Sequence, residues 1–231
     1  MNLYKKIFPK KNSLFIVIHV VSKKQANENV KIAFESGADG VFLINHSSGY
    51  ESLIEIYREI KQQYPNFWIG LNLLDLSASA VLDYVPNNAS GLWVDNIGLN
   101  EEHDCINYIA QKNWVQKQEK YQEMIYFGSI AFKYQKEVKQ LDWVACLAKE
   151  YADVVVTSGD RTGSPPNLHK IKTIRKNIDH SPLAIASGIT PENVSQYKAY
   201  ADAFLVATGI SDSFTKLNSH KTEQLVKEIN K

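Results

Sequence analysis

The amino-acid sequence predicts an α/β protein that folds as a single eight-stranded parallel (β/α)8 barrel of near-minimal size. Two observations predict this fold. Eight short apolar runs recur along the chain, and segments with helical periodicity lie between them. A chain of 231 residues leaves about 29 residues for each strand–helix unit, which is near the lower limit for such a barrel. A doubly wound open sheet is the structural alternative.

Each predicted strand is a short run that is rich in β-branched and aromatic side chains. Because the runs are apolar at consecutive positions, we expect parallel strands that are covered on both faces. Strands that alternate with helices in this way imply right-handed crossovers. The eight runs are LFIVIHV from Leu14, GVFLIN from Gly40, WIGLNLL from Trp68, GLWVDN from Gly91, MIYFGSI from Met124, DVVVTSG from Asp153, LAIASG from Leu183 and AFLVAT from Ala203.

The segments between the runs have the periodicity of amphipathic helices. In SLIEIYREIKQQY, for example, the apolar residues fall on one broad stripe. LDWVACLAKEYAD and NLHKIKTIRKNI show the same pattern, and TEQLVKEIN is expected to form the final helix. No linker or change in composition interrupts the alternation. We therefore expect one TIM-barrel domain over residues 1–231, with residues 1–12 as an N-terminal leader.

The composition is that of an ordinary globular protein, with 44% hydrophobic and 22% charged residues. A formal net charge of +1 gives no broad field that would attract nucleic acid, so no nucleic-acid partner is expected. The apolar run from Leu14 is too short to span a bilayer, which favours a cytoplasmic protein without an integral membrane segment. Four lysines, Lys5, Lys6, Lys10 and Lys11, are interpreted as part of a solvated leader, with a weak contact to a membrane or an acidic partner as the alternative.

Two stretches place a glycine where a predicted strand ends. ASGITPENV carries Gly188 after the seventh strand, and LVATGIS carries Gly209 after the eighth. The loops after these two strands frequently bind phosphate in such barrels, and a glycine lets backbone amides approach an anion. Thr190 is expected to cap a helix whose N-terminus adds positive charge, and GISDSF is expected to form a short extra helix. The predicted phosphate-binding residues are Ser187, Gly188, Ile189, Thr190, Thr208, Gly209 and Ile210. The alternative is that both glycines serve only the turns.

The loop after the sixth strand, TSGDRTGSPPNL, supports an anion site. Arg161 offers a guanidinium suited to a phosphate or carboxylate, and Gly163 leaves room for a close approach. We expect Asp160 and Arg161 to close over the ligand. The alternative is an Asp–Arg surface pair that holds its own loop together.

Polar residues gather near the predicted ends of the strands, and in barrels of this class that end carries the active site. Asp95 is the predicted general base, and His19 and Asp160 are the other predicted catalytic residues. Asn72 is predicted to contact the substrate. The remaining polar residues at these positions are Asn45, His46, Asn96, Ser129 and Lys133.

Two other chemistries are weakly supported. A Schiff-base aldolase requires a desolvated lysine inside the barrel, whereas none of the eight runs contains a lysine and Lys133 lies in a loop. A metal site from His19, His46 and Asp95 has no local ligand motif. Cys105 and Cys146 show neither a disulfide pattern nor metal-ligand spacing. We therefore expect no metal and no cofactor.

Several of these segments resemble the BtpA family. VVVTSGDRTGSPPNLHKIKTIR is similar to that family's sixth strand, loop and helix, and PLAIASGITPENVSQYKAYADAFLVATGIS is similar to its seventh and eighth units. IGLNLLDLSASAVL resembles the third unit. The resemblance implies a (β/α)8 fold with a phosphate-type pocket and an enzyme that acts on sugar- or nucleotide-like ligands. The rim differs from the family: VVSKKQAN follows His19 without a Pro/Gly-rich loop, LLDLS follows Asn72, and Tyr134 stands where a histidine is usual.

Two hypotheses follow. The first is an enzyme, an isomerase, lyase or hydrolase, that acts on a small phosphorylated substrate by acid–base chemistry. The second is a non-catalytic barrel that serves as an assembly or regulatory factor and still binds a phosphorylated ligand. The shortened rim favours the second hypothesis. A homo-oligomer is also open, with Trp114 or Trp143 as candidate interface residues.

Overall fold

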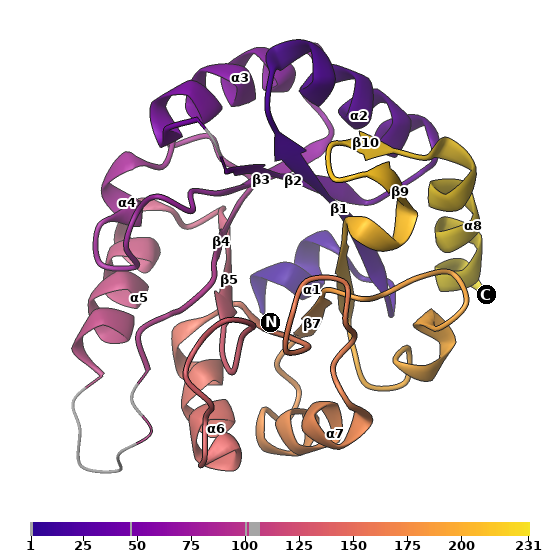
Figure 1. The fold of residues 1–231 in the computed structure, drawn as a ribbon. Coiled ribbons are helices and arrows are strands. Elements are labelled where there is room, and N and C mark those ends of the chain that lie inside the picture. The colour runs from indigo at the N-terminus through magenta and orange to yellow at the C-terminus, as the bar shows by residue number, and fades with distance from the viewer. Residues whose placement is uncertain (1, 47, 100, 102–106) are drawn as a thin grey trace.

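The computed structural model describes residues 2–46, 48–99, 101 and 107–231. Eight parallel strands close into a barrel in sequence order, and helices surround it (Figure 1). The predicted (β/α)8 fold is confirmed, and each predicted run contains its strand to within one residue. The strands are β1 (Ser13–Val20), β2 (Gly40–Asn45), β3 (Trp68–Asn72), β4 (Gly91–Val94), β5 (Ile125–Ser129), β6 (Val154–Ser158), β7 (Leu183–Ala186) and β8 (Ala203–Val206). The open sheet is excluded because β8 pairs with β1, with Leu14 beside Phe204.

The helices form the outer layer, and along each longer helix buried residues recur at helical spacing between exposed ones. In α3, for example, Leu53, Tyr57 and Ile60 are buried at helical spacing. The helices are α1 (Leu3–Ile7), α2 (Lys23–Glu35), α3 (Tyr50–Gln63), α4 (Val81–Tyr84), α5 (Tyr108–Lys120), α6 (Leu141–Tyr151), α7 (Leu168–Asn177) and α8 (Ser219–Asn230). Cys146 lies in α6, whereas Cys105 lies outside the described residues.

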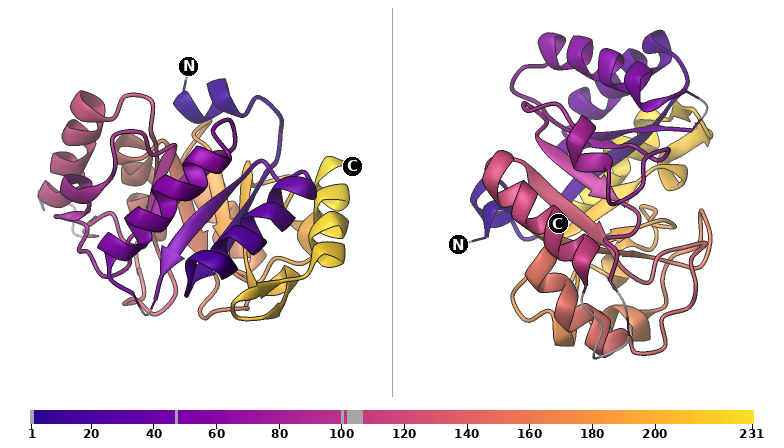
Figure 2. Two further views of the ribbon diagram at one scale, coloured as in Figure 1. Left: turned by 90° about the horizontal axis from the view of Figure 1, so that it is seen from above. Right: turned by 90° about the vertical axis from the view of Figure 1, so that its left-hand side faces the viewer.

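The leader is part of the core, which differs from the interpretation of a solvated segment. Helix α1 lies across the end of the barrel where the strands begin, opposite the hairpin that follows β8 (Figure 2). The Phe8 ring packs edge-on against Phe15 at 5.0 Å, and the Tyr4 hydroxyl donates to the carbonyl oxygen of Asp202 at 2.8 Å. The Tyr4 and Phe8 side chains therefore fill the barrel interior at the end where the strands begin. The lysines of the leader lie at the surface.

Two predicted helices at the other end are wrong. After β7 the chain forms turns around a single 3-10 helix, η1 (Val194–Gln196), in place of an α-helix. The Asn193 side chain organises these turns, because it accepts from Thr190 N at 2.9 Å and donates to Gly188 O at 2.7 Å. After β8, the 3-10 helix η2 (Thr208–Ile210) is followed by a hairpin of β9 (Ser211–Ser213) and β10 (Lys216–Leu217). No α-helix dipole therefore points at the predicted phosphate site from η1.

Candidate active site

A cavity of about 220 Å³ lies at the carboxyl ends of the strands, and we call it the mouth cavity. Its floor is apolar and is built by Val17, Ile44, Trp93, Ala186 and Leu205. Polar side chains from six different strands or their loops form its walls: His19, His46, Asp95, Lys133, Ser187 and Thr208. A concave apolar site with a few convergent polar groups has the form of a small-molecule site.

Asp95 follows β4 and is largely buried in the wall of the mouth cavity. Its Oδ1 atom accepts a hydrogen bond from Asn72 Nδ2 at 2.9 Å. Burial raises the pKa of the Asp95 carboxyl above its ordinary value, although the bond from Asn72 and the charges of Lys133 and His46 oppose this shift. A carboxyl group with a raised pKa is a stronger base, so Asp95 is suited to take and return a proton.

His19 and His46, from the ends of β1 and β2, form a pair in the same cavity. His19 Nδ1 lies 2.7 Å from His46 Nε2, so one ring donates and the other accepts. Burial lowers the pKa of His19 to about 4, and neighbouring His46 and Lys133 act in the same direction. The Phe214 ring stacks on His19 with a centroid distance of 4.1 Å. At neutral pH His19 is therefore an uncharged group that can relay a proton.

Lys133 lies in the loop after β5, and its half-buried side chain reaches the mouth cavity. Its ammonium donates to Ser187 Oγ at 3.2 Å. Burial lowers the pKa of this amine, with Asp95 and Tyr134 opposing. Sequence reasoning gave Lys133 little weight because it lies outside every apolar run. The structure shows that a loop lysine reaches the site.

The loops after β6, β7 and β8 pack tightly against one another. A Cβ atom on Gly188 would lie 2.0 Å from Pro165 N, and one on Gly209 would lie 2.0 Å from Ile189 O. Both glycines are therefore required for the contact between loops, whatever else they bind. Gly188 also has a positive φ of +69°, as does Ser187 with +79°. Over the described part of the chain, the backbone amides of Gly188, Ile189 and Gly209 have no hydrogen-bond acceptor.

The structure brings some of the predicted phosphate-binding residues to the mouth cavity and leaves others outside it. Ser187, Thr208 and Gly163 line the cavity, whereas Gly188 and Gly209 are next to lining residues but are not among them. The side chains of Ile189 and Ile210 are buried in the hydrophobic core and do not line the cavity, so only their backbone could contact a ligand. The Thr190 amide is already bonded to the Asn193 side chain.

The remaining predicted residues lie around the mouth cavity. Asn72 lines an adjacent pocket and contacts Asp95. Asp160 is exposed and faces a separate open pocket near Lys170, so the structure does not bring it to Asp95 and His19. Arg161 is exposed, and its Nε donates to Ser164 Oγ at 3.2 Å. The predicted lid role of Asp160 and Arg161 stays a prediction.

Two residues of the cavity wall were missed by sequence reasoning. Phe214 covers His19 from the β9–β10 hairpin, and Tyr134 reaches across to the β6 loop, where its hydroxyl lies 3.2 Å from Thr162 Oγ1. Neither residue directly follows one of the eight barrel strands. The hairpin is held by α2, because Gln25 and Asn29 each donate to the carbonyl oxygen of Thr215.

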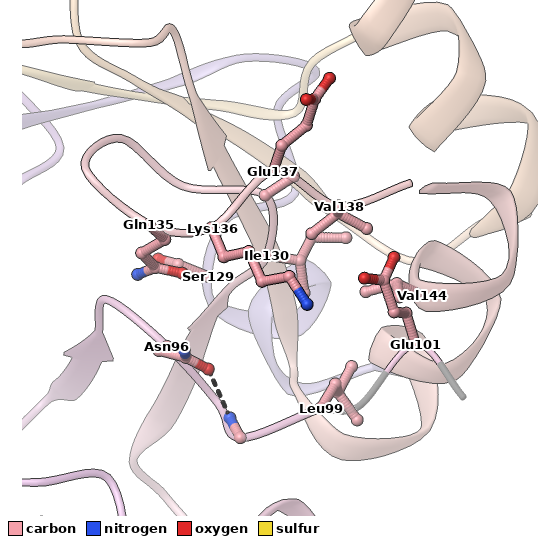
Figure 3. Close-up of a pocket in the computed structure, with 12 residues that line it drawn as sticks. Asn96, Leu99, Glu101, Ser129, Ile130, Gln135, Lys136, Glu137, Val138 and Val144 are labelled. Carbon is pink, nitrogen blue, oxygen red and sulfur yellow. Dashed lines mark hydrogen bonds between the residues drawn. The ribbon is translucent and has the colours of Figure 1, made fainter. Parts of the chain in front are cut away.

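A further pocket of about 380 Å³ lies outside the barrel, between the loops after β4 and β5 (Figure 3). Two of its polar groups already have structural partners. Asn96 Oδ1 accepts from Gly98 N at 2.7 Å, and the Glu101 carboxylate accepts from Lys139 N at 2.7 Å. This pocket therefore lacks the convergent reactive groups of the mouth cavity. Among the described residues, no group of three or more His, Cys, Asp and Glu side chains is placed to hold a metal ion.

Comparisons with known proteins agree with this fold. Phosphoribosyl anthranilate isomerase from Thermus thermophilus superposes with a TM-score of 0.67 and 14% identity, covering 94% of this chain and 98% of that one. GGGPS from Thermoplasma volcanium superposes with a TM-score of 0.70 and 14% identity, covering 99% and 98%. At such identities the likeness concerns the fold. No helix in the described residues has the length and hydrophobicity to cross a membrane.

The sequence relatives are uncharacterised archaeal proteins. A Pyrococcus horikoshii protein is 32% identical over 76 residues, and a Methanocaldococcus jannaschii protein is 30% identical over 79 residues. These matches span 33% and 34% of this chain but only 29% and 30% of the relatives. The BtpA family model matches residues 124–231, which include β5 to β8 and the loops of the predicted phosphate site. Over residues 124–231 the chain therefore matches the BtpA family, which confirms the resemblance predicted for its sixth, seventh and eighth units. The resemblance of residues 69–82 to the third unit lies outside this match.

Proposed function

We propose that the protein is an enzyme that acts on a small phosphorylated substrate by acid–base chemistry in the mouth cavity. One observation carries this proposal: the largely buried Asp95 and the uncharged His19 share a cavity with the loops after β7 and β8. Phosphoribosyl anthranilate isomerase, whose name states a phosphorylated substrate, has the same fold. The expected cellular location is the cytoplasm, the expected partner is a small phosphorylated ligand, and no nucleic acid is required.

The phosphate group would lie against the backbone amides of Gly188, Ile189 and Gly209. Each hydrogen bond to a charged group contributes on the order of 1.5–3 kcal/mol, so two or three of them would hold a phosphate ester. Lys133 lies on the cavity side of this loop cluster, bonded to Ser187, and its amine offers a further N–H donor. The Thr208 side chain, which lines the same cavity, offers a further hydroxyl donor.

Asp95 would remove a proton from the bound substrate and return it at another atom. The raised pKa of its carboxyl brings its basicity nearer to neutral pH, which favours proton transfer. The bond from Asn72 fixes the orientation of the carboxylate and leaves its other oxygen for the substrate. His19 would carry a proton between the substrate and the outer ring of His46.

Exchange of substrate hydrogens with solvent tests this proposal, because proton abstraction by a base is common to isomerase and lyase reactions. Triose, pentose and nucleoside phosphates are incubated with the protein in D₂O, and loss of C–H signals is followed by proton NMR. We expect at least one of these esters to exchange with the wild type and none with Asp95→Asn. Calorimetric binding of the same ester by Asp95→Asn shows that the variant retains its site. Exchange at equal rates in both proteins would exclude Asp95 as the base.

A non-catalytic assembly factor is the second proposal, and an exposed surface on α5 favours it. Tyr108 and Val115 are 70% and 48% exposed, and with Ile109 they place apolar side chains at the surface of one helix. Such a surface would suit a protein partner or a second copy of the chain. Binding of phosphate esters without any exchange or turnover would favour this second function.

A further inference from the structure

The buried lysines of this protein differ in what holds their charge. Lys117 forms an ion pair with Asp153 at 2.8 Å, and both side chains are almost fully buried. Lys170 donates to two backbone carbonyls, including Ser158 O at 2.7 Å. These two amines are already committed to the fold. Lys133 is different, because the partner of its amine is a neutral hydroxyl at the wall of a cavity.

Lys133 has no counter-charge in direct contact. Its amine lies 3.2 Å from Ser187 Oγ and 5.4 Å from the centre of the Phe132 ring. Across the described residues, no carboxylate lies within ion-pair distance of it. A half-buried ammonium without an ion partner is destabilised relative to the neutral amine, and its pKa falls. The neutral amine is a nucleophile.

The loop that carries Lys133 has an unusual backbone. Ala131 and Tyr134, on either side of Phe132 and Lys133, have positive φ angles of +45° and +61°. Residues other than glycine adopt positive φ angles at an energetic cost, and residues strained in this way cluster at functional sites. The Lys170 amine holds the base of this loop through the carbonyl oxygen of Ala131. The fold therefore maintains a strained turn that brings one lysine to the cavity.

We propose that the amine of Lys133 forms a covalent iminium with the carbonyl carbon of a phosphorylated aldehyde or ketone bound in the mouth cavity. This inference rests on the proposed function and names its substrate class. Asp95 and His46, which line the same cavity, supply and accept the protons that the reaction needs. Ser187 positions the amine through its hydroxyl group.

The reaction balances without any further reagent. The lone pair of the neutral amine forms a C–N bond with the carbonyl carbon, and the carbonyl oxygen takes up a proton from the protonated Asp95 carboxyl. The nitrogen of this carbinolamine loses its extra proton to the Asp95 carboxylate. The hydroxyl group then leaves as water with a proton from the same acid, and the positive C=N bond remains. The iminium acidifies the neighbouring C–H bond, so Asp95 can remove that proton next.

Borohydride trapping tests the inference directly. The wild-type protein is incubated with dihydroxyacetone phosphate or with pyruvate, reduced with sodium borohydride, digested and analysed by mass spectrometry. We expect a reduced adduct on Lys133 from dihydroxyacetone phosphate, at least about tenfold above the adducts on Lys170 and on surface lysines. Lys133→Arg keeps the positive charge and should give no adduct in this peptide. Lys136→Met, which removes an exposed lysine from the same loop, should label like the wild type.

The outcomes separate this inference from the proposed function. Equal labelling of Lys133 and the surface lysines, or no adduct on Lys133 from either probe, overturns the iminium. If a phosphate ester still binds and exchanges its hydrogens in that case, the proposed function stands alone. Selective labelling of Lys133 by pyruvate, together with failure of every phosphate ester to bind, would support the iminium and overturn the phosphate site.

Discussion

The two ends of the barrel treat charge in opposite ways. Where the strands begin, Asp39, Asp153 and Asp202 precede β2, β6 and β8. Each carboxylate accepts from one backbone amide near the start of the preceding strand. The donors are Leu14 N at 2.8 Å, Tyr126 N at 2.8 Å and Leu183 N at 2.9 Å. Each also pairs with a cation: the partners are Lys10, Lys117 and Arg175. These three carboxylates join neighbouring strands, and their charge is balanced by the fold.

Asp95 at the opposite end has only the neutral amide of Asn72 as its side-chain hydrogen-bond partner among the described residues. Within the same described residues, the only hydrogen-bond partner of the Lys133 amine, in the same cavity, is the hydroxyl group of Ser187. The end where the strands begin, which α1 covers, is called the closed end, and its charges stabilise the fold. The end with the mouth cavity is called the open end, and it leaves an acid and a base incompletely paired around that cavity. This difference supports the proposal that the mouth cavity is an active site, because a group that is fully paired is poorly placed to react.

The largest expected effect is at the closed end. Asp153→Asn leaves the buried Lys117 ammonium without its counter-charge, and we expect the free energy of unfolding to fall by about 3–5 kcal/mol. Urea unfolding measures this loss. Asp39→Asn is the matched control, because its partner Lys10 is partly exposed and the pair should contribute at most about 1 kcal/mol. Similar losses in the two variants would show that burial does not distinguish these pairs.

The free energy of unfolding should fall in acid because of His19 at the open end. The pKa of His19 is about 4 in the folded protein and near 6.5 when unfolded, so the unfolded chain binds more protons between these values. Stability is therefore lost as the pH falls below about 6.5, and His19 should account for about 2 kcal/mol between pH 7 and pH 5. Urea unfolding at both pH values, with His19→Gln as the comparison, measures this share. An equal pH dependence in the two proteins would contradict it.

Asp95→Asn should affect stability much less than Asp153→Asn. The variant removes a carboxyl group whose ionised form is disfavoured by burial, and an amide can still bond to Asn72. We expect the free energy of unfolding at pH 7 to be unchanged or slightly higher, within about 1 kcal/mol of the wild type. Thermal unfolding at pH 7 is sufficient to measure this. A loss comparable to that of Asp153→Asn would remove the contrast between the two ends.

The smallest expected effect concerns the β9–β10 hairpin. Phe214 is 50% exposed but stacks on His19, so Phe214→Ala should lower the free energy of unfolding by less than about 1 kcal/mol. Removal of this ring admits water to His19, and the pKa of His19 should rise toward its ordinary value. Histidine resonances followed by NMR across the acid range report this shift. An unchanged pKa would mean that the hairpin does not shield the site.

The alternation of strands and helices could be predicted from sequence because a strand that is buried on both faces is apolar at consecutive positions. The sequence also shows an Ala-Asp pair at residues 38–39, 152–153 and 201–202. It does not show that these three aspartates join neighbouring strands. Their cations come from Lys10, Lys117 and Arg175, at unrelated distances along the chain. Such pairing is a property of the closed barrel and has no local signal.

The candidate site was predicted in part. Asp95 and Ser187 directly follow strands and His19 lies near the end of β1, and parallel strands bring such positions to one end. Lys133 and Phe214 reach the cavity from loops whose course depends on strained or hairpin backbone, and apolar periodicity does not describe such segments. The helix expected after Thr190 fails for a similar reason, because Asn193 bonds back to Gly188 and Thr190 and forms turns instead.

A crystal structure of the protein with a phosphate ester that exchanges its hydrogens would show whether the mouth cavity is the active site. We expect the phosphate group within hydrogen-bond distance of the Gly188 and Gly209 amides, with the rest of the ligand against Asp95 and Lys133. A ligand bound in the pocket between the loops after β4 and β5, with the mouth cavity empty, would contradict it.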